Sequence, residues 1–202
     1  MVSVGSEQND LNLAADFLAA KGLSAQRFTA AEMKAGKTPD FRVFQKEQLA
    51  AYCEVKSPRD DRLDNALALA DPGSLVGYGG NDSTFNRIAN QVHKAVQQFD
   101  AVNPNRELPN ILVFINWAYP SSFRDLEETL TGYLRLESDR CEPTMLKVSE
   151  GRIRDEKYRI DAYCWIDGRT QRLQSTLFNP ANDAHCNTVC SLLQIDRATI
   201  KT

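Results

Sequence analysis

Apolar side chains recur along the chain at two spacings, which predict helices and strands. Helical spacing predicts helices over 9–20, 84–100, 122–133 and 187–194. Alternating or continuous apolar runs predict strands over 25–28, 41–44, 49–55, 111–115, 158–165 and 172–178. A short polar link, 45–48, joins the second and third strands, so these two are expected to form an antiparallel hairpin. The order of the elements predicts an α/β fold with a mixed central β-sheet flanked by helices.

The helix over 84–100 has the clearest apolar stripe, and Asp82 or Ser83 is expected to cap its N-terminus. Before it, residues 57–83 lose the periodic pattern: charged side chains come first, part of 63–70 has helical character, and glycines follow. Such a long excursion is expected to be a flap with a flexible second half. A length of 202 residues suits a single domain, 1–202.

Composition excludes few functions. The chain shows no leader segment, and its longest apolar run, Ile111 to Ile115, is too short to span a bilayer, so a cytoplasmic protein without a membrane partner is expected. The five cysteines have no scaffold-like spacing and are expected to be free thiols, several of them buried. His185, Cys186 and Cys190 could be a fragment of a zinc site, but no second ligand pair with zinc-site spacing accompanies them.

The informative residues are two carboxylates and a lysine on the predicted hairpin. Pro39-Asp40 is followed, after thirteen residues, by Glu54-Val55-Lys56. Glu54 and Lys56 are two residues apart on one strand, so both should point to the same face. A hard divalent cation would accept oxygen ligands from Asp40, Glu54 and the main-chain carbonyl of Val55. Lys56 would then position a water molecule or neutralise charge that develops on a phosphate.

The acid-x-Lys pattern alone is not specific, because it occurs three times in this chain: at 32–34, 54–56 and 155–157. Only the copy at 54–56 lies on an apolar strand and follows the single Pro-Asp pair at hairpin distance.

With these residues the chain resembles the PD-(D/E)xK nuclease superfamily, which includes type II restriction enzymes. The resemblance covers about residues 7–116, and residues 117–202 are expected to pack on this core. It implies a restriction-endonuclease-like core, with a mixed four-stranded sheet, and hydrolysis of phosphodiester bonds, with DNA as the expected polymer. The implied cofactor is Mg²⁺, for which Mn²⁺ could substitute. The implied catalytic residues are Asp40, Glu54 and Lys56, with Glu7 from the leading helix and Gln91, or alternatively His93, from the helix after the lysine strand.

Several readings stay open beside this one. Arg59, Arg62 and Arg87 could bind phosphates, although alternating charges also suit a solvated segment. Trp117 could stack on a base or cap the core. Asp40, Glu54 and Lys56 could form only a surface salt bridge.

The net charge of −3 does not indicate a nucleic-acid partner by itself. The alternatives are a non-catalytic nucleic-acid- or protein-binding module of the same fold, a regulatory partner protein, and a phosphoesterase that acts on nucleotides. The sequence leaves open whether the chain forms a homodimer.

Overall fold

The fold is known from a computed structural model, which describes residues 6–58, 69–71, 73, 82–117, 121–135, 140–143 and 153–197. The helices of this part of the chain are α1 (Glu7–Ala19), α2 (Ala30–Ala35), α4 (Asp82–Val102), α5 (Phe123–Thr131) and α6 (Asp183–Leu193), with a short 3-10 helix at Glu156–Arg159. The strands are β1 (Ser24–Arg27), β2 (Phe41–Gln45), β3 (Gln48–Lys56), β4 (Asn110–Asn116), β5 (Tyr133–Arg135), β6 (Cys141–Pro143), β7 (Ala162–Asp167) and β8 (Arg172–Phe178).

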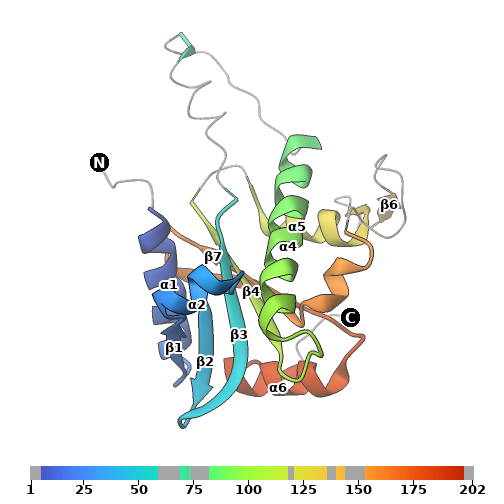
Figure 1. Ribbon diagram of the computed structural model, residues 1–202. Helices are drawn as coiled ribbons and strands as arrows, with labels where there is room; N and C mark the ends of the chain where they lie inside the picture. The colour runs from blue at the N-terminus through green and yellow to red at the C-terminus, as the bar shows by residue number, and fades with distance from the viewer. Residues whose placement is uncertain are drawn as a thin grey trace.

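A mixed six-stranded sheet forms the centre of the molecule, with strand order β1-β2-β3-β4-β7-β8 (Figure 1). The first three strands are antiparallel, β3, β4 and β7 run parallel, and β8 returns antiparallel at the far edge. The predicted α/β fold with a mixed sheet is therefore confirmed. Every residue of β4 except Asn116 is buried, as expected for a central strand covered on both faces.

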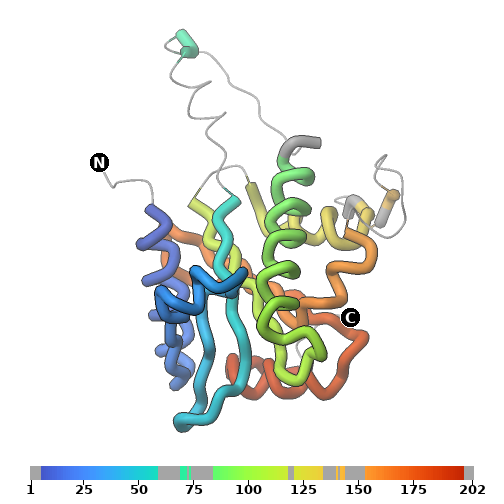
Figure 2. Tube along the Cα trace, viewed as in Figure 1, coloured from blue at the N-terminus to red at the C-terminus, as the bar shows by residue number. Residues whose placement is uncertain are grey.

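Helices cover both faces of the sheet. On one face α1 and α6 pack against apolar side chains of the strands, including Val43, Val113 and Cys164. On the other face α4 and α5 pack against Leu112, Phe114 and Trp165. Figure 1 shows α1 and α4 flanking the strands, and Figure 2 shows the N-terminal elements, α1 to β3, lying together beside the path of α4. Each face thus has its own hydrophobic core.

Four details differ from the sequence-based expectations. Helix α2 lies in a segment for which no helix was predicted, and Thr29 and Glu32 begin it with a capping box. Asp82 and Ser83 are the first residues of α4 and not caps before it. Helix α5 ends at Thr131 and not at Tyr133, because Gly132 takes a left-handed conformation with φ of +76°. The predicted strand at 158–165 starts only at Ala162, since the 3-10 helix precedes it.

The other differences are an additional pair of short strands and the start of the last helix. The short hairpin of β5 and β6 was not predicted, and α6 begins four residues earlier than expected, capped by Asn182. Most of the excursion at 57–83, including the helical character expected near 63–70, lies outside the described residues. In the described part of the chain, no helix combines the length and apolar character needed to cross a membrane.

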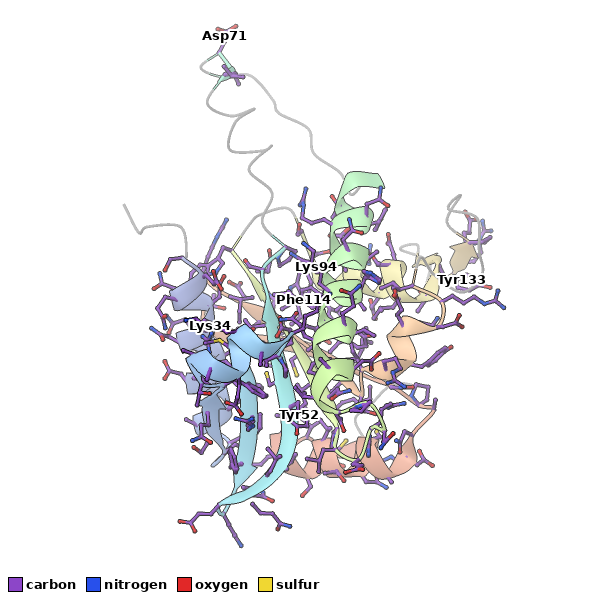
Figure 3. All side chains as sticks on the ribbon, viewed as in Figure 1. Lys34, Tyr52, Asp71, Lys94, Phe114 and Tyr133 are labelled. Atoms are coloured by element: carbon purple, nitrogen blue, oxygen red, sulfur yellow. The ribbon has the colours of Figure 1, made fainter. Side chains whose placement is uncertain are left out.

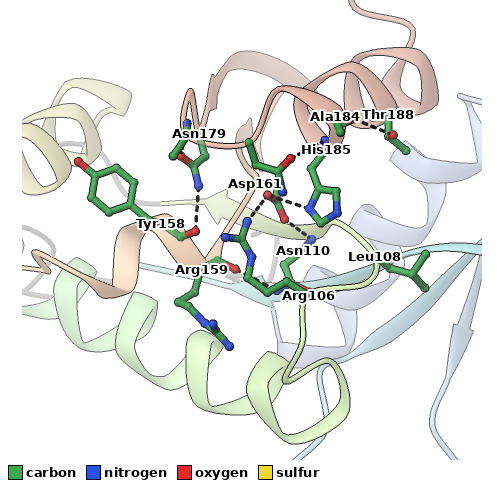
Figure 4. A network of polar contacts seen from close by, with 12 residues as sticks. Arg106, Leu108, Asn110, Tyr158, Arg159, Asp161, Asn179, Ala184, His185 and Thr188 are labelled. Atoms are coloured by element: carbon green, nitrogen blue, oxygen red, sulfur yellow. Dashed lines mark hydrogen bonds and ion pairs between the residues drawn. The ribbon is translucent and has the colours of Figure 1, made fainter.

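A buried polar network joins several elements at the end of the sheet where β4 and β7 begin (Figure 4). Asp161, which is 1% exposed, accepts a hydrogen bond from the backbone N–H of Asn110 at 2.9 Å and forms an ion pair with Arg106. His185 of α6 approaches the same carboxylate, with Nδ1 3.1 Å from Oδ1. Asn179 accompanies them and donates its side-chain amide to the carbonyl of Tyr158. This network fixes where β7 starts and where α6 docks.

The position of His185 bears on whether it forms a zinc site with Cys186 and Cys190. Its Nδ1 faces a carboxylate, and no group of three His, Cys, Asp or Glu side chains that could hold a metal occurs within the described ranges. Cys53, Cys164, Cys186 and Cys190 are buried free thiols, as expected. The side chain of Cys141 is not among the side chains that the structure describes.

Replacing Asp161 with Ala should destabilise the protein by about 3–5 kcal/mol, because it leaves the Arg106 charge and the Asn110 N–H without their buried acceptor. Urea unfolding followed by circular dichroism measures the change. Asp183→Ala is the control, since Asp183 pairs with Arg197 at the surface and its loss should cost less than about 1 kcal/mol. Equal losses for the two variants would contradict a structural role of the network.

Candidate active site

Asp40 and Glu54 lie side by side where β2 begins and β3 ends, and each is bound by the backbone of the other strand. The backbone N–H of Asp40 donates to Glu54 Oε2 at 2.9 Å, and the N–H of Val55 donates to Asp40 Oδ2 at 2.9 Å. The antiparallel pairing of Phe41 with Cys53 places these residues opposite each other. The local order of the hairpin therefore brings the two carboxylates together.

Lys56 completes the group from the same strand. Its ammonium forms an ion pair with Glu54 Oε1 and donates to Gln98 Oε1 of α4 at 3.0 Å. The Gln98 amide in turn donates to the carbonyl of Thr38 at 3.0 Å, just before Asp40. Asp40, Glu54 and Lys56 are thus brought together as the hairpin interpretation requires, and α4 holds the lysine in place.

Burial changes the chemistry of Glu54. This side chain is only 1% exposed, against 18% for that of Lys56. Burial, and next the negative charge of Asp40, raise the pKa of Glu54 from 4.5 to about 8, although Lys56 acts in the opposite direction. An additional cation would favour the ionised form of this carboxylate, and the ionised carboxylate would in turn attract the cation.

A cavity of about 350 Å³ opens beside these residues. Four carboxylates line it, together with one lysine, a glutamine and a few neutral residues: Glu7, Asp10, Asp40, Glu54, Lys56, Gln98, Leu11, Val55 and Ser57. Glu7 and Asp10 come from the first turn of α1, one turn apart. The leading helix therefore contributes acidic side chains to the cavity wall, and Glu7, the residue suggested by the sequence, is one of them.

These donors suit a hard divalent cation, because carboxylate and carbonyl oxygens are the ligands that Mg²⁺ prefers. Within the described residues no three Asp, Glu, His or Cys side chains approach closely enough to hold an ion together. An ion at Asp40 and Glu54 would thus complete its shell with oxygens from the Val55 main chain, solvent and substrate, which is the usual arrangement for Mg²⁺.

The structure places the other predicted site residues elsewhere. Gln91 does not line the cavity; its amide donates to the carbonyl of Ser57 at 2.7 Å, at the end of β3. His93 contacts Glu156 and Gln97 on the exposed side of α4. Neither residue is the polar group that α4 contributes to the cavity; Gln98 is.

Of the arginines expected to bind phosphates, only Arg87 can be located. It lies on α4 and is partly buried, and its role stays a prediction. Arg59 and Arg62 lie outside the described residues.

Sequence reasoning missed Gln98 and Asp10. Gln98 lies two turns after Gln91 on the same face of α4, so the helical period alone could not choose between them. The Lys56 side chain reaches back along its strand toward Glu54, which brings its amine next to the later turn. For Asp10 a signal existed: it stands one helical turn after Glu7, among apolar residues of the buried stripe.

Comparison of the chain with protein-family models, with curated proteins and with solved structures gives no match.

The raised pKa of Glu54 predicts that, in the presence of a chelator, the free energy of unfolding falls as the pH rises from 4.5 to about 8. In this interval Glu54 keeps its proton in the folded chain and has lost it in the unfolded chain. The stability that Glu54 contributes is therefore complete below pH 4.5 and is lost as the pH rises to the folded pKa of about 8. The part of the slope that Glu54 contributes is at most about 1.4 kcal/mol per pH unit. Urea unfolding between pH 4.5 and 8.5 measures it, and Glu54→Gln should flatten the curve. Parallel curves for the two proteins would show that Glu54 ionises normally in the fold.

Proposed function

We propose that the protein is a magnesium-dependent nuclease that hydrolyses phosphodiester bonds of nucleic acid, with DNA as the expected polymer, on a restriction-endonuclease-like core. The observation that carries the proposal is the interlocked group of Asp40, Glu54 and Lys56 beside a cavity lined by four carboxylates. A surface salt bridge would not explain a glutamate that is 1% exposed and a second carboxylate held against it. The resemblance of these residues to the PD-(D/E)xK motif supports the same proposal.

In this proposal Asp40, Glu54 and the Val55 carbonyl would hold the cation. The cation would polarise the scissile phosphate and make water a better nucleophile. The water oxygen forms a bond to phosphorus, the bond to the leaving sugar oxygen breaks, and the proton lost by the water reaches the leaving oxygen through solvent. Lys56 stabilises the negative charge that grows on the phosphate oxygens in the transition state. Gln98 keeps the lysine directed at this position.

The direct test incubates the purified full chain with plasmid, linear and single-stranded DNA, in the presence of magnesium, manganese or a chelator. Cleavage that requires the metal supports the proposal. Metal-dependent binding without cleavage of any polymer would favour the alternative, a non-catalytic binding module of the same fold.

Lys56→Ala should lower the cleavage rate by on the order of 10²- to 10³-fold and leave the affinity for nucleic acid nearly unchanged. Its proposed interaction is made in the transition state, and losing such an interaction lowers the rate without weakening ground-state binding. Lys94→Ala is the matched control, because Lys94 lies on the exposed face of α4 (Figure 3). Rates and affinities are compared at one fixed salt concentration. Equal cleavage by wild type and Lys56→Ala would assign the activity to another site or to a contaminant.

Asp40→Asn should remove most of the affinity for Mg²⁺ and Mn²⁺ while the fold persists, because one of two charged ligands is lost. Isothermal titration calorimetry at millimolar metal measures the affinity, and circular dichroism checks the fold. Asp100→Asn gives the same chemical change outside the cavity, because Asp100 does not line it and pairs instead with Arg159 of the 3-10 helix. Unchanged metal affinity in Asp40→Asn would remove Asp40 from the proposed site.

A further inference from the structure

Trp117 connects the cavity to a distant part of the chain. It follows β4 directly, and its indole N–H donates to Oδ1 of Asp10 in the first turn of α1. Asp10 is 5% exposed and lines the same cavity as Asp40 and Glu54. A tryptophan that lies 107 residues further along the chain therefore holds one oxygen of this fourth carboxylate.

The turn between β7 and β8 holds the tryptophan from its other side. The indole lies so close to Gly168 that a Cβ atom there would be 2.5 Å from Cδ2 of Trp117, nearer than real Cβ atoms approach. The N–H of Gly168 donates to the carbonyl of Asn116 at 2.9 Å, and Arg169 Nε donates to the carbonyl of Trp117 at 3.3 Å. One face of the ring is covered and its N–H is engaged, so packing and hydrogen bonding explain this aromatic side chain better than stacking on a base.

We propose that Trp117 is a positioning residue of the active site, which acts through Asp10 and is itself held by the β7–β8 turn. This inference rests on the proposed function, because it concerns the affinity of the cavity for a divalent cation. Asp40 and Glu54 are the only two carboxylates proposed to bind the ion directly, so the other negative charges on the cavity wall supply the rest of its electrostatic attraction. Such charges act strongly where water is scarce. A hydrogen bond from a fixed donor to a carboxylate is short and directional, and it keeps the Asp10 charge facing the cavity.

The test measures binding of Mn²⁺ by electron paramagnetic resonance, without nucleic acid, to the full chain and three variants. Trp117→Phe keeps a ring against Gly168 and removes the N–H, and Asp10→Asn removes the charge. Each should weaken Mn²⁺ binding about tenfold, the lower end of the range for residues that orient metal ligands. The double variant should bind as weakly as Asp10→Asn alone, because Trp117 acts only through Asp10.

Trp165→Phe is the matched control: the same N–H is removed from a tryptophan buried in the other core, and Mn²⁺ binding should not change. Gly168→Ala displaces the indole without altering α1 and should reproduce the loss seen in Trp117→Phe, which keeps the test decisive if Trp117→Phe is unstable. Wild-type binding in both Trp117→Phe and Gly168→Ala would overturn this inference and leave the nuclease proposal standing. Wild-type protein that binds no Mn²⁺, either alone or with DNA present, would overturn both.

Discussion

The pairing of β2 with β3 is the constraint on which the site depends. Two backbone N–H groups, one from each strand, are directed at the carboxylate carried by the other strand. A shift of one residue in this register would turn Glu54 and Lys56 to the opposite face of the sheet and separate them from Asp40. The apolar residues that alternate with them, Cys53 and Val55, are buried against α1 and α6, and so they hold the register. The core on one face of the sheet thereby positions the charged groups on the other.

Buried polar groups lie at both ends of the sheet, but they are satisfied differently. At the end where β4 and β7 begin, the Asp161 carboxylate accepts hydrogen bonds from Arg106 and from the Asn110 N–H, and His185 lies beside it. At the other end Glu54 faces a second carboxylate and an open cavity, with Lys56 as its close cation. Burial of a charge costs several kcal/mol unless partners compensate it. The first arrangement is the one expected of structural support, and the second is the one expected of a site that receives a ligand.

The elements that could be predicted are those whose pattern is local. The hairpin of 41–44 and 49–55, the stripe of α4 and the apolar run of β4 were predicted close to their observed bounds. Helix α2 was missed although Thr29 and Glu32 are a capping-box pair, because only six residues follow and none of them is buried. The start of β7 could not be predicted, since it is set by contacts of Asp161 with Asn110 and Arg106, which are distant in sequence.

The same division applies to the candidate site. Asp40, Glu54 and Lys56 were predictable because one hairpin carries all three, whereas the groups that hold them come from other elements. Gln98 approaches Lys56 only because α4 crosses this face of the sheet. Asp10 is hydrogen-bonded to Trp117, which directly follows β4 and is held by Gly168 of the β7–β8 turn. The part of the chain after residue 116, to which the sequence motif assigns no function, thus reaches the candidate site through Trp117, which is held against Gly168 and donates to Asp10. If orientation of the acidic residues limits the chemistry of this site, then its activity depends on a part of the chain that contains none of the motif.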